Sequence, residues 1–361
     1  MRNVLLLLFS AHETNEGDKM IKKDGLFLFF YRLFASFAIK YVFLISDRMK
    51  RLLLLVLWVW VACFTAASHN YMFKHLEVKD GLSNNQVNAI YKDSHGFMWF
   101  GTASGLNRYD GYDTRIYRSL KDDGNSLPDS YIEDIQEDAT GNLWVRTGAG
   151  YAIYNSVSDI FDRNVEGWMW HIGISGNPST VYIDSEKIFW IYVAGKGIYC
   201  YKPGQENAVM VAGTDTLLTE MNITDMTECS EGILLAFGNG VLACLDREKL
   251  NVKWTFDGIA SQWGKNQSET FTLFVDSHER VWMYSVEGMW VYHLPKKSWE
   301  VRSVRSDRSN MVRAISQDKY GNIWIGRDQD GIEVIGLDGE SVRLMNDPNN
   351  ERTISNRSEE R

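Results

Sequence analysis

The sequence is poor in cysteine and proline and has no excess of basic charge. Its 361 residues include only 4 Cys and 5 Pro, and Lys+Arg 38 against Asp+Glu 47 gives a net charge of -9. So few cysteines exclude a disulfide-dense scaffold, and the acidic balance argues against a nucleic-acid-binding face. In contrast, 29 Gly, 13 Trp and 17 Tyr favour strands and tight turns over helices.

The sequence also lacks the motifs that mark common active sites. It contains no GxxxxGK[ST], HExxH, GxSxG or CxxC pattern. Cys200, Cys229 and Cys244 have no metal-like spacing, and we interpret them as small buried hydrophobes. We therefore predict no catalytic residue, no metal and no cofactor.

The amino terminus differs from the rest of the chain. Residues 25–45 are apolar, but Arg32 and Lys40 interrupt the run and make it a poor membrane span. We interpret residues 1–48 as an over-extended N-terminus or an extra apolar segment.

A secretory signal peptide is predicted directly after that segment. Residues 49–51 are basic, residues 52–61 form a short apolar run, and residues 65–67 are small. This order is typical of a signal peptide, which we place at residues 49–68. An uncleaved N-terminal membrane anchor is the alternative. Either reading implies export, and cleavage leaves residues 69–361 as the mature domain.

A repeat of about 45 residues fills the remainder of the chain. In five copies a Trp follows an Asp by six residues. The pairs are Asp93 and Trp99, Asp138 and Trp144, Asp184 and Trp190, Asp276 and Trp282, and Asp318 and Trp324. The fourth copy is degenerate, with Cys229 in the Asp place and Leu235 in the Trp place. Such regular spacing indicates a repeat architecture.

Each repeat is predicted to be one four-stranded blade. A short strand leads to an Asp-x-x-Gly turn, the Trp lies on the second strand, and two further strands follow. Four antiparallel strands per 40 to 50 residues are typical of a β-propeller, so the predicted class is all-β. We count six blades and the start of a seventh near Thr353, an incomplete seven-blade ring.

The repeated residues are interpreted as structural. A Trp at the same place in every blade is expected to pack against the neighbouring sheet, although ligand contact is the alternative. The repeated Asp is expected to close its turn, with acid–base or calcium-binding carboxylates as the alternative.

The repeat resembles a known family. The pattern Asp-x-x-Gly-x-apolar-Trp-apolar-Gly-Thr, followed by Gly-Leu-x-x-Tyr, is similar to the two-component-regulator propeller repeat, and so is the opening segment over residues 73–87. The resemblance covers residues 71–357. It implies the N-terminal periplasmic sensor region of a hybrid two-component histidine kinase/response regulator. In the intact parent protein the implied partners are an oligosaccharide ligand, a second propeller and membrane-linked signalling domains, with a homodimer as a possible assembly.

The chain departs from the full plan of that family. No kinase, receiver or membrane segment follows the repeats, so we expect a truncated, non-catalytic sensor module that regulates glycan utilisation only in an intact parent protein. An exported propeller enzyme, such as a lyase or glycosidase, is the first alternative. A nonfunctional truncated remnant is the second.

Candidate ligand-binding residues are those that depart from the repeat. Trp168, Trp170 and His171 lie between the second and third copies and could hold a sugar, or they could pack a longer strand or the next blade. Arg146 and Arg327 replace small residues of the repeat and could contact an acidic sugar or a partner domain. Exposure without function is the alternative for both arginines.

Overall fold

The computed structural model describes residues 71–213, 222–259, 269–304, 311–328, 330–350 and 352–354. The chain divides into two compact units, and the fold below is that of the unit which contains residues 74–361. The segments predicted at residues 1–48 and 49–68 lie outside the described residues, as does most of the seventh repeat. Within the described ranges no helix is long and apolar enough to cross a membrane.

The described chain forms six antiparallel sheets of four strands, here called blades 1 to 6. Blade 1 contains β1 (Val87–Lys92), β2 (Met98–Thr102), β3 (Gly105–Tyr109) and β4 (Thr114–Tyr117). Blade 2 contains β5 (Ile132–Glu137), β6 (Leu143–Thr147), β7 (Gly150–Asn155) and β8 (Ile160–Asp162). Blade 3 contains β9 (Thr180–Ile183), β10 (Phe189–Val193), β11 (Gly197–Tyr201) and β12 (Val209–Met210).

The other three blades repeat this order. Blade 4 contains β13 (Ile223–Cys229), β14 (Gly232–Phe237), β15 (Leu242–Asp246) and β16 (Asn251–Phe256). Blade 5 contains β17 (Thr272–Val275), β18 (Arg280–Tyr284), β19 (Gly288–His293) and β20 (Ser298–Val304). Blade 6 contains β21 (Val312–Gln317), β22 (Ile323–Arg327), β23 (Ile332–Ile335) and β24 (Ser341–Leu344). The short helices are η2 (Val78–Asp80) and α4 (Val165–His171).

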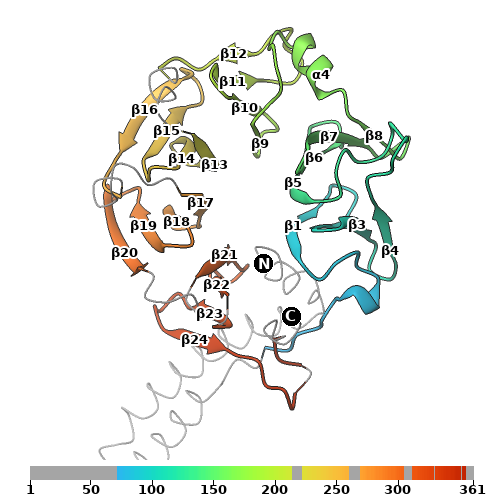
Figure 1. The fold of residues 1–361 in the computed structure, drawn as a ribbon. Helices are drawn as coiled ribbons and strands as arrows, with labels where there is room; N and C mark the ends of the chain where they lie inside the picture. The colour runs from blue at the N-terminus through green and yellow to red at the C-terminus, as the bar shows by residue number, and fades with distance from the viewer. Residues whose placement is uncertain are drawn as a thin grey trace, which may run out of the picture. The chain divides into compact units, whose positions relative to one another are not determined.

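The six blades are arranged as a β-propeller, which confirms the predicted fold class. The first strand of every blade lies innermost in the ring, and the fourth lies outermost (Figure 1). The core lies between blades: Trp99 packs with blade 2 residues, and Trp190 packs with blade 4 residues. Blades 3 and 4 bury both faces of their sheets against neighbouring blades, and their second strands β10 and β14 are accordingly buried and almost wholly apolar.

A hydrogen bond explains the fixed spacing of Asp and Trp. In blade 1 the Asp93 carboxylate accepts from the backbone N–H groups of His95 and Phe97 at 3.0 and 2.9 Å, and from Trp99 Nε1 at 2.7 Å. The same side-chain bond measures 3.3, 3.0, 2.8 and 3.1 Å in blades 2, 3, 5 and 6. One carboxylate therefore closes the turn and fixes the indole on the second strand.

Blade 4 corrects one detail of the sequence interpretation. In blade 1 the residue opposite Trp99 is Tyr91, two before the Asp. In blade 4 the residue two before Cys229 is Thr227, and its partner is Leu234 rather than Leu235. The turn of blade 4 is one residue shorter, so counting six residues from Cys229 overshoots the Trp position by one.

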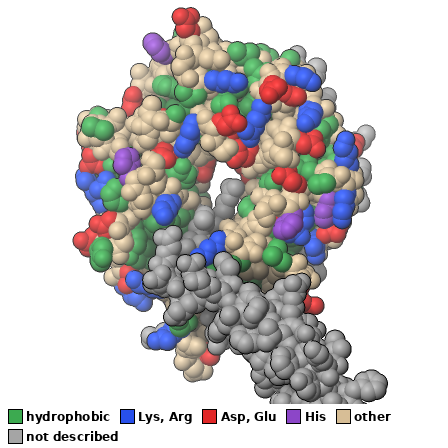
Figure 2. All heavy atoms as spheres, turned by 180° about the vertical axis from the view of Figure 1, so that it is seen from behind, with side chains coloured by type: hydrophobic (Ala, Val, Ile, Leu, Met, Phe, Trp, Pro, Cys, Tyr) green, Lys and Arg blue, Asp and Glu red, His purple; other side chains and the backbone are tan. Residues whose placement is uncertain are grey.

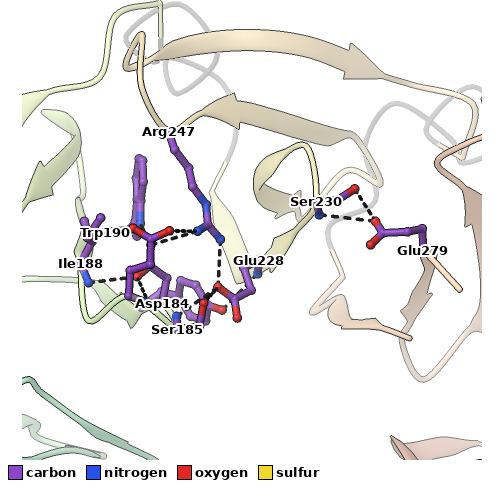
Figure 3. A network of polar contacts seen from close by, with 10 residues as sticks. Asp184, Ser185, Ile188, Trp190, Glu228, Ser230, Arg247 and Glu279 are labelled. Carbon is purple, nitrogen blue, oxygen red and sulfur yellow. Dashed lines mark hydrogen bonds and ion pairs between the residues drawn. The ribbon is translucent and has the colours of Figure 1, made fainter. Parts of the chain in front are cut away.

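Serine side chains join neighbouring blades. Ser185, the residue after the Asp of blade 3, donates from N and Oγ to the Glu228 carboxylate of blade 4 at 3.0 and 2.8 Å (Figure 3). Ser230 of blade 4 bonds Glu279 of blade 5 in the same way, at 3.4 and 2.6 Å. Ser94 donates to Glu137 in the same way, and Ser277 donates from its backbone N–H to Gln317 Oε1 while its hydroxyl accepts from Gln317 Nε2. We call these four contacts the serine latches.

Candidate functional site

A pocket of about 340 Å³ lies at the inner strands of blades 1 to 4. It is lined by side chains that end the first strands or begin the turns after them, so it opens at the end of the blades where the Asp turns lie. Acidic and basic side chains surround the opening between the blades (Figure 2). The lining residues that matter here are Tyr91, Gln136, Glu137, Tyr182, Lys187 and Glu228. We call this site the inner pocket.

Three lining residues occupy one repeated position. Tyr91, Gln136 and Tyr182 each stand opposite the Trp of their own blade, two residues before the Asp. The propeller repeat therefore brings a phenol, an amide and a second phenol from successive blades to one side of the inner pocket, here called the pocket wall. Rigid strands hold these groups, which favours a preformed binding site.

Bonds between blades fix the orientation of this wall. Gln136 Oε1 accepts from the backbone N–H of Ile183 at 2.6 Å, and its Nε2 donates to Val181 O at 2.9 Å. The Tyr182 hydroxyl accepts from the Glu228 backbone N–H at 3.0 Å. The amide of Gln136 is thus committed to the backbone, while the Tyr182 hydroxyl keeps a proton that it can donate.

Glu137 is a buried carboxylate held in its ionised form. It accepts from Ser94 N and Oγ at 3.0 and 2.7 Å, and Lys187 Nζ lies 3.5 Å from its Oε2. Burial alone would raise the pKa of Glu137, but the bonds from Ser94 and the charge of Lys187 outweigh it and lower the pKa. Lys187 also donates to the Glu137 carbonyl at 2.9 Å.

Glu228 is ionised for similar reasons. Burial opposes its charge, but bonds from Ser185 and the Arg247 guanidinium lower its pKa below the usual value. Arg247 Nη2 donates to Glu228 at 2.9 Å, and Nη1 lies 3.9 Å from the fully buried Asp184 carboxylate (Figure 3). The pocket rim therefore carries paired charges, with carboxylates in excess.

The tyrosine hydroxyls of the pocket stay protonated at neutral pH. Burial, together with the charge of Glu137, raises the pKa of Tyr91 to about 12. Burial and Glu228 also raise the pKa of Tyr182. A general acid or base works best with a pKa near the operating pH. The shifted groups of this site are suited to hydrogen bonding rather than to proton transfer.

The aromatic candidates of the sequence lie on α4, the connection between blades 2 and 3. Trp168 packs edge-on against Trp144, with ring centroids 4.6 Å apart, and against Phe189 and Tyr201. Trp170 points away and is 65% exposed, and His171 is exposed. The segment is a short helix rather than a longer strand, and it places only Trp168 in the packing between blades.

The two arginine candidates lie on different blades and do not meet. Arg146 on β6 pairs with Glu133 of its own blade at 2.8 Å. Arg327 on β22 is buried and donates to Glu333 at 2.7 Å. Both lie near the ends of second strands. Because strands alternate in direction, those ends and α4 belong to the blade ends opposite the Asp turns, and hence opposite the inner pocket.

The pocket residues escaped the sequence analysis because they lie inside the repeat. The position two before the Asp reads Tyr91, Gln136, Tyr182, Thr227, Phe274 and Ser316 in the six blades. A repeated position that changes its chemistry from blade to blade could have indicated a surface that contacts something other than the next blade. The ligand candidates named from the sequence were instead residues that depart from the repeat pattern.

Comparison with known proteins supports the repeat assignment. The sequence model of the family described as two component regulator propeller matches residues 81–104, 126–149 and 306–326. Histidine kinase P4 of Formosa agariphila is 40% identical over 62 residues, which are 17% of this chain and 4% of that protein.

Solved structures share the fold. The extracellular domain of the hybrid two component system BT3049 from B. thetaiotaomicron superposes with a TM-score of 0.60 at 18% identity, over 80% of this chain and 38% of that one. The chain therefore spans less than half of that ectodomain. Virginiamycin B lyase from Staphylococcus aureus gives a TM-score of 0.50 at 9% identity, over 73% of this chain and 85% of that one. With its blade pattern and the three matched segments, this chain carries the two-component regulator propeller repeat.

Proposed function

We propose that the chain is a non-catalytic, extracytoplasmic ligand-sensing module of a hybrid two-component system that regulates glycan utilisation. The observation that carries the proposal is the inner pocket, a preformed site on the blades of a family whose name links it to two-component regulators. The similarity in fold to an extracellular domain of such a system supports the same conclusion. Export by the signal peptide at residues 49–68 would place the module in the periplasm.

The chemistry of the pocket favours a neutral oligosaccharide as the ligand. Tyr91 and Tyr182 offer hydroxyl groups, and Lys187 offers an ammonium donor. A volume of about 340 Å³ is within the range of small-molecule sites. The excess of carboxylates at the rim opposes acidic sugars, since unpaired like charges repel.

The same groups argue against the exported lyase or glycosidase. Such an enzyme needs a proton donor or acceptor that titrates near neutral pH. The pKa of Glu137 is lowered and that of Tyr91 is raised to about 12, so neither group meets this requirement. The fold similarity to virginiamycin B lyase leaves an enzyme as the second candidate.

Signalling would require partners outside this chain. We propose that a second propeller and membrane-linked signalling domains of a parent protein receive the ligand signal, with a homodimer as the unit that responds. A ligand can shift such a dimer only if it binds the two arrangements with different affinity.

Calorimetry of the purified chain with neutral and acidic oligosaccharides tests this function. We expect binding of a neutral oligosaccharide that Tyr182→Ala weakens by about tenfold or more, since the hydrogen bond from the Tyr182 hydroxyl is lost. Trp170→Ala, at the opposite blade ends, is the matched control and should bind normally. Binding lost in Trp170→Ala and kept in Tyr182→Ala would move the site to α4, and turnover of the sugar would favour the enzyme.

A further inference from the structure

Blade 1 carries an arginine at a position that is uncharged in every other blade. Arg108 on β3 is paired with Trp99, the core indole of the blade. The residues that hold the equivalent position in blades 2 to 6 are Ile153, Cys200, Cys244, Val291 and Val334. The charge of Arg108 is therefore a departure of blade 1 from the repeat, and it lies on the third strand, in the outer half of the blade (Figure 1).

The strand register places a second arginine beside the first. Arg115 on β4 is paired with Arg108, and both project to the side of the sheet where Trp99 packs with blade 2. Like charges directly opposite each other destabilise a sheet. Asp159 of blade 2 forms an ion pair with Arg115 and offsets that charge. Arg108 forms no ion pair within the described residues, and its Nη1 donates only a long bond of 3.4 Å to the Tyr154 hydroxyl.

Aromatic rings hold the Arg108 guanidinium in place. Its central carbon lies 4.8 Å from the ring centroid of Phe97 and 5.9 Å from that of Trp99. A guanidinium over a ring face is attracted to the ring and keeps its N–H groups at the edge of its own plane. It has five N–H donors, and the contact with Tyr154 uses one of them. The cation is thus fixed in position, with donors available to a ligand.

A second pocket, of about 130 Å³, lies beside this guanidinium. Its lining includes Phe97, Arg108 and Arg115, together with Asp110 and Asp113 from the turn between β3 and β4. We call this site the outer pocket. Within the described residues neither carboxylate forms an ion pair with Arg108 or with another cation. Charges of both signs therefore line one pocket without direct contact between them.

Hydrogen bonds fix the turn that carries the two carboxylates. Asp110 Oδ1 accepts from the backbone N–H groups of Asp113 and Tyr112, at 2.8 Å each, and Asp110 N donates to Asp113 O at 3.3 Å. The bonds from Asp113 and Tyr112, assisted by the charge of Arg108, lower the pKa of Asp110. Asp110 is thus committed to the turn. The Asp113 carboxylate receives no hydrogen bond within the described residues and is available to a ligand.

We propose that the outer pocket binds a small zwitterion with a carboxylate and an ammonium group on one carbon, which is the chemistry of a free α-amino acid. Arg108 donates N–H bonds to the ligand carboxylate, and the Asp113 carboxylate accepts from the ligand ammonium group. A ligand with one charge alone would meet a like charge on the opposite side of the pocket. The volume is well below the roughly 300 Å³ of typical small-molecule sites, so the ligand is compact, such as alanine.

The outer pocket is separate from the inner pocket. The two share no lining residue, although the β3–β4 turn lies at the same blade end as the Asp turns. Binding of a zwitterion at blade 1 does not depend on oligosaccharide binding at the inner pocket. It would give the module a second ligand of a different chemical class.

The test is calorimetry of the full-length chain with L-alanine, propionate and ethylamine. Propionate lacks the amine of alanine, and ethylamine lacks its carboxylate. We expect L-alanine to bind with a Kd of about 1 mM or tighter. Propionate and ethylamine should bind about tenfold or more weakly than alanine, since each loses hydrogen bonds between charged groups. No binding of alanine at about 10 mM, or propionate bound as tightly as alanine, would overturn the proposal.

Three variants assign the binding to the outer pocket. Arg108→Val introduces the residue that blades 5 and 6 carry, so the blade should fold while alanine binding falls about tenfold or more. Asp113→Asn, in an exposed turn, should weaken alanine equally but leave propionate unchanged or tighter, because a repelling charge is removed. Arg118→Gln changes an exposed arginine outside the pocket lining and should bind normally. Unchanged alanine affinity in Arg108→Val and Asp113→Asn would contradict the assignment.

Discussion

At the scale of single residues, the repeated aspartate links a turn to a core indole. Asp184 accepts from the backbone N–H groups of Glu186 and Ile188 at 3.0 and 2.9 Å and from Trp190 Nε1 at 3.0 Å. Its carboxylate has no exposed surface. Such a group orders a turn and a core indole at the same time. Its removal would leave three buried hydrogen-bond donors without an acceptor.

Asp184→Ala is expected to lower the free energy of unfolding by about 3 kcal/mol. Each buried donor left without an acceptor costs about 1 to 3 kcal/mol, and water that enters the space left by the carboxylate offsets part of the total for the three donors. Urea unfolding followed by tryptophan fluorescence measures the loss. Asp246→Ala is the control: Asp246 accepts only from the backbone N–H groups of Glu248 and Lys249. Similar losses in both variants would show that the indole bond adds nothing to the turn.

The sequence allowed the repeated residues to be predicted, but not their mutual bond. Spacing placed Asp93 and Trp99 on consecutive strands, and turn chemistry assigned the carboxylate to backbone N–H groups. The second carboxylate oxygen, which binds the indole at 2.7 Å, depends on how the two strands pair. That pairing also moved the blade 4 position from Leu235 to Leu234, because the pattern carries no information about a turn shortened by one residue.

At the scale of elements, the serine latches hold one blade to the next. Each pairs the residue after the Asp position with a carboxylate or amide of the following blade, as in Ser94 with Glu137 and Ser277 with Gln317. Blade 2 has Ala139 in the Ser place, and there Lys187 and Gln136 make the contact with blade 3 instead. The same side chains line the inner pocket, so blade packing and ligand geometry depend on shared residues.

The charge of Glu137 should make this packing sensitive to acid. Its pKa in the folded chain is lowered below the ordinary 4.5, so its contribution to stability is present above pH 4.5 and is lost as the pH falls through the folded value. In urea titrations between pH 7 and pH 3, Glu137→Gln should lose less stability with acidification than the unmodified chain does. Gln317 shows that an amide can accept the Ser bond. Parallel pH profiles for the two proteins would contradict this role, and the exposed Glu340→Gln serves as the control.

The candidate site was the part that sequence reasoning could not place. The sequence marks Trp168, Trp170 and His171 as candidates because they break the repeat. Only the fold shows that the Trp168 ring packs against Trp144. The inner pocket combines residues that recur about every 45 positions and come together only because the blades form a ring, such as Tyr91, Gln136 and Tyr182 on blades 1 to 3. A search of the repeat for variable chemistry at a fixed position is the step that would have found it.

At the scale of the molecule, the first and last described segments meet. His75, before blade 1, donates from Nε2 to the carbonyl oxygen of Thr353, after blade 6, at 2.7 Å, and the two residues are 278 positions apart. Leu82 of the same opening segment is buried with the first blade. A propeller protects its edges by joining its last elements to its first, and this contact contributes to that joining in the described chain.

His75→Ala should therefore loosen the C-terminal segment more than it destabilises the blades. We expect a loss of about 1 kcal/mol in the free energy of unfolding, together with faster proteolytic cleavage near residues 352–354 under native conditions. His75→Gln keeps an N–H donor on a side chain of similar reach and should restore part of the protection. If cleavage in His75→Ala matches that of the unmodified chain while global stability falls, the bond supports blade 1 rather than the junction of the two segments. Comparing the cleavage rate near residues 352–354 with the free energy of unfolding therefore distinguishes a bond that stabilises blade 1 alone from a contact that joins the two ends of the ring.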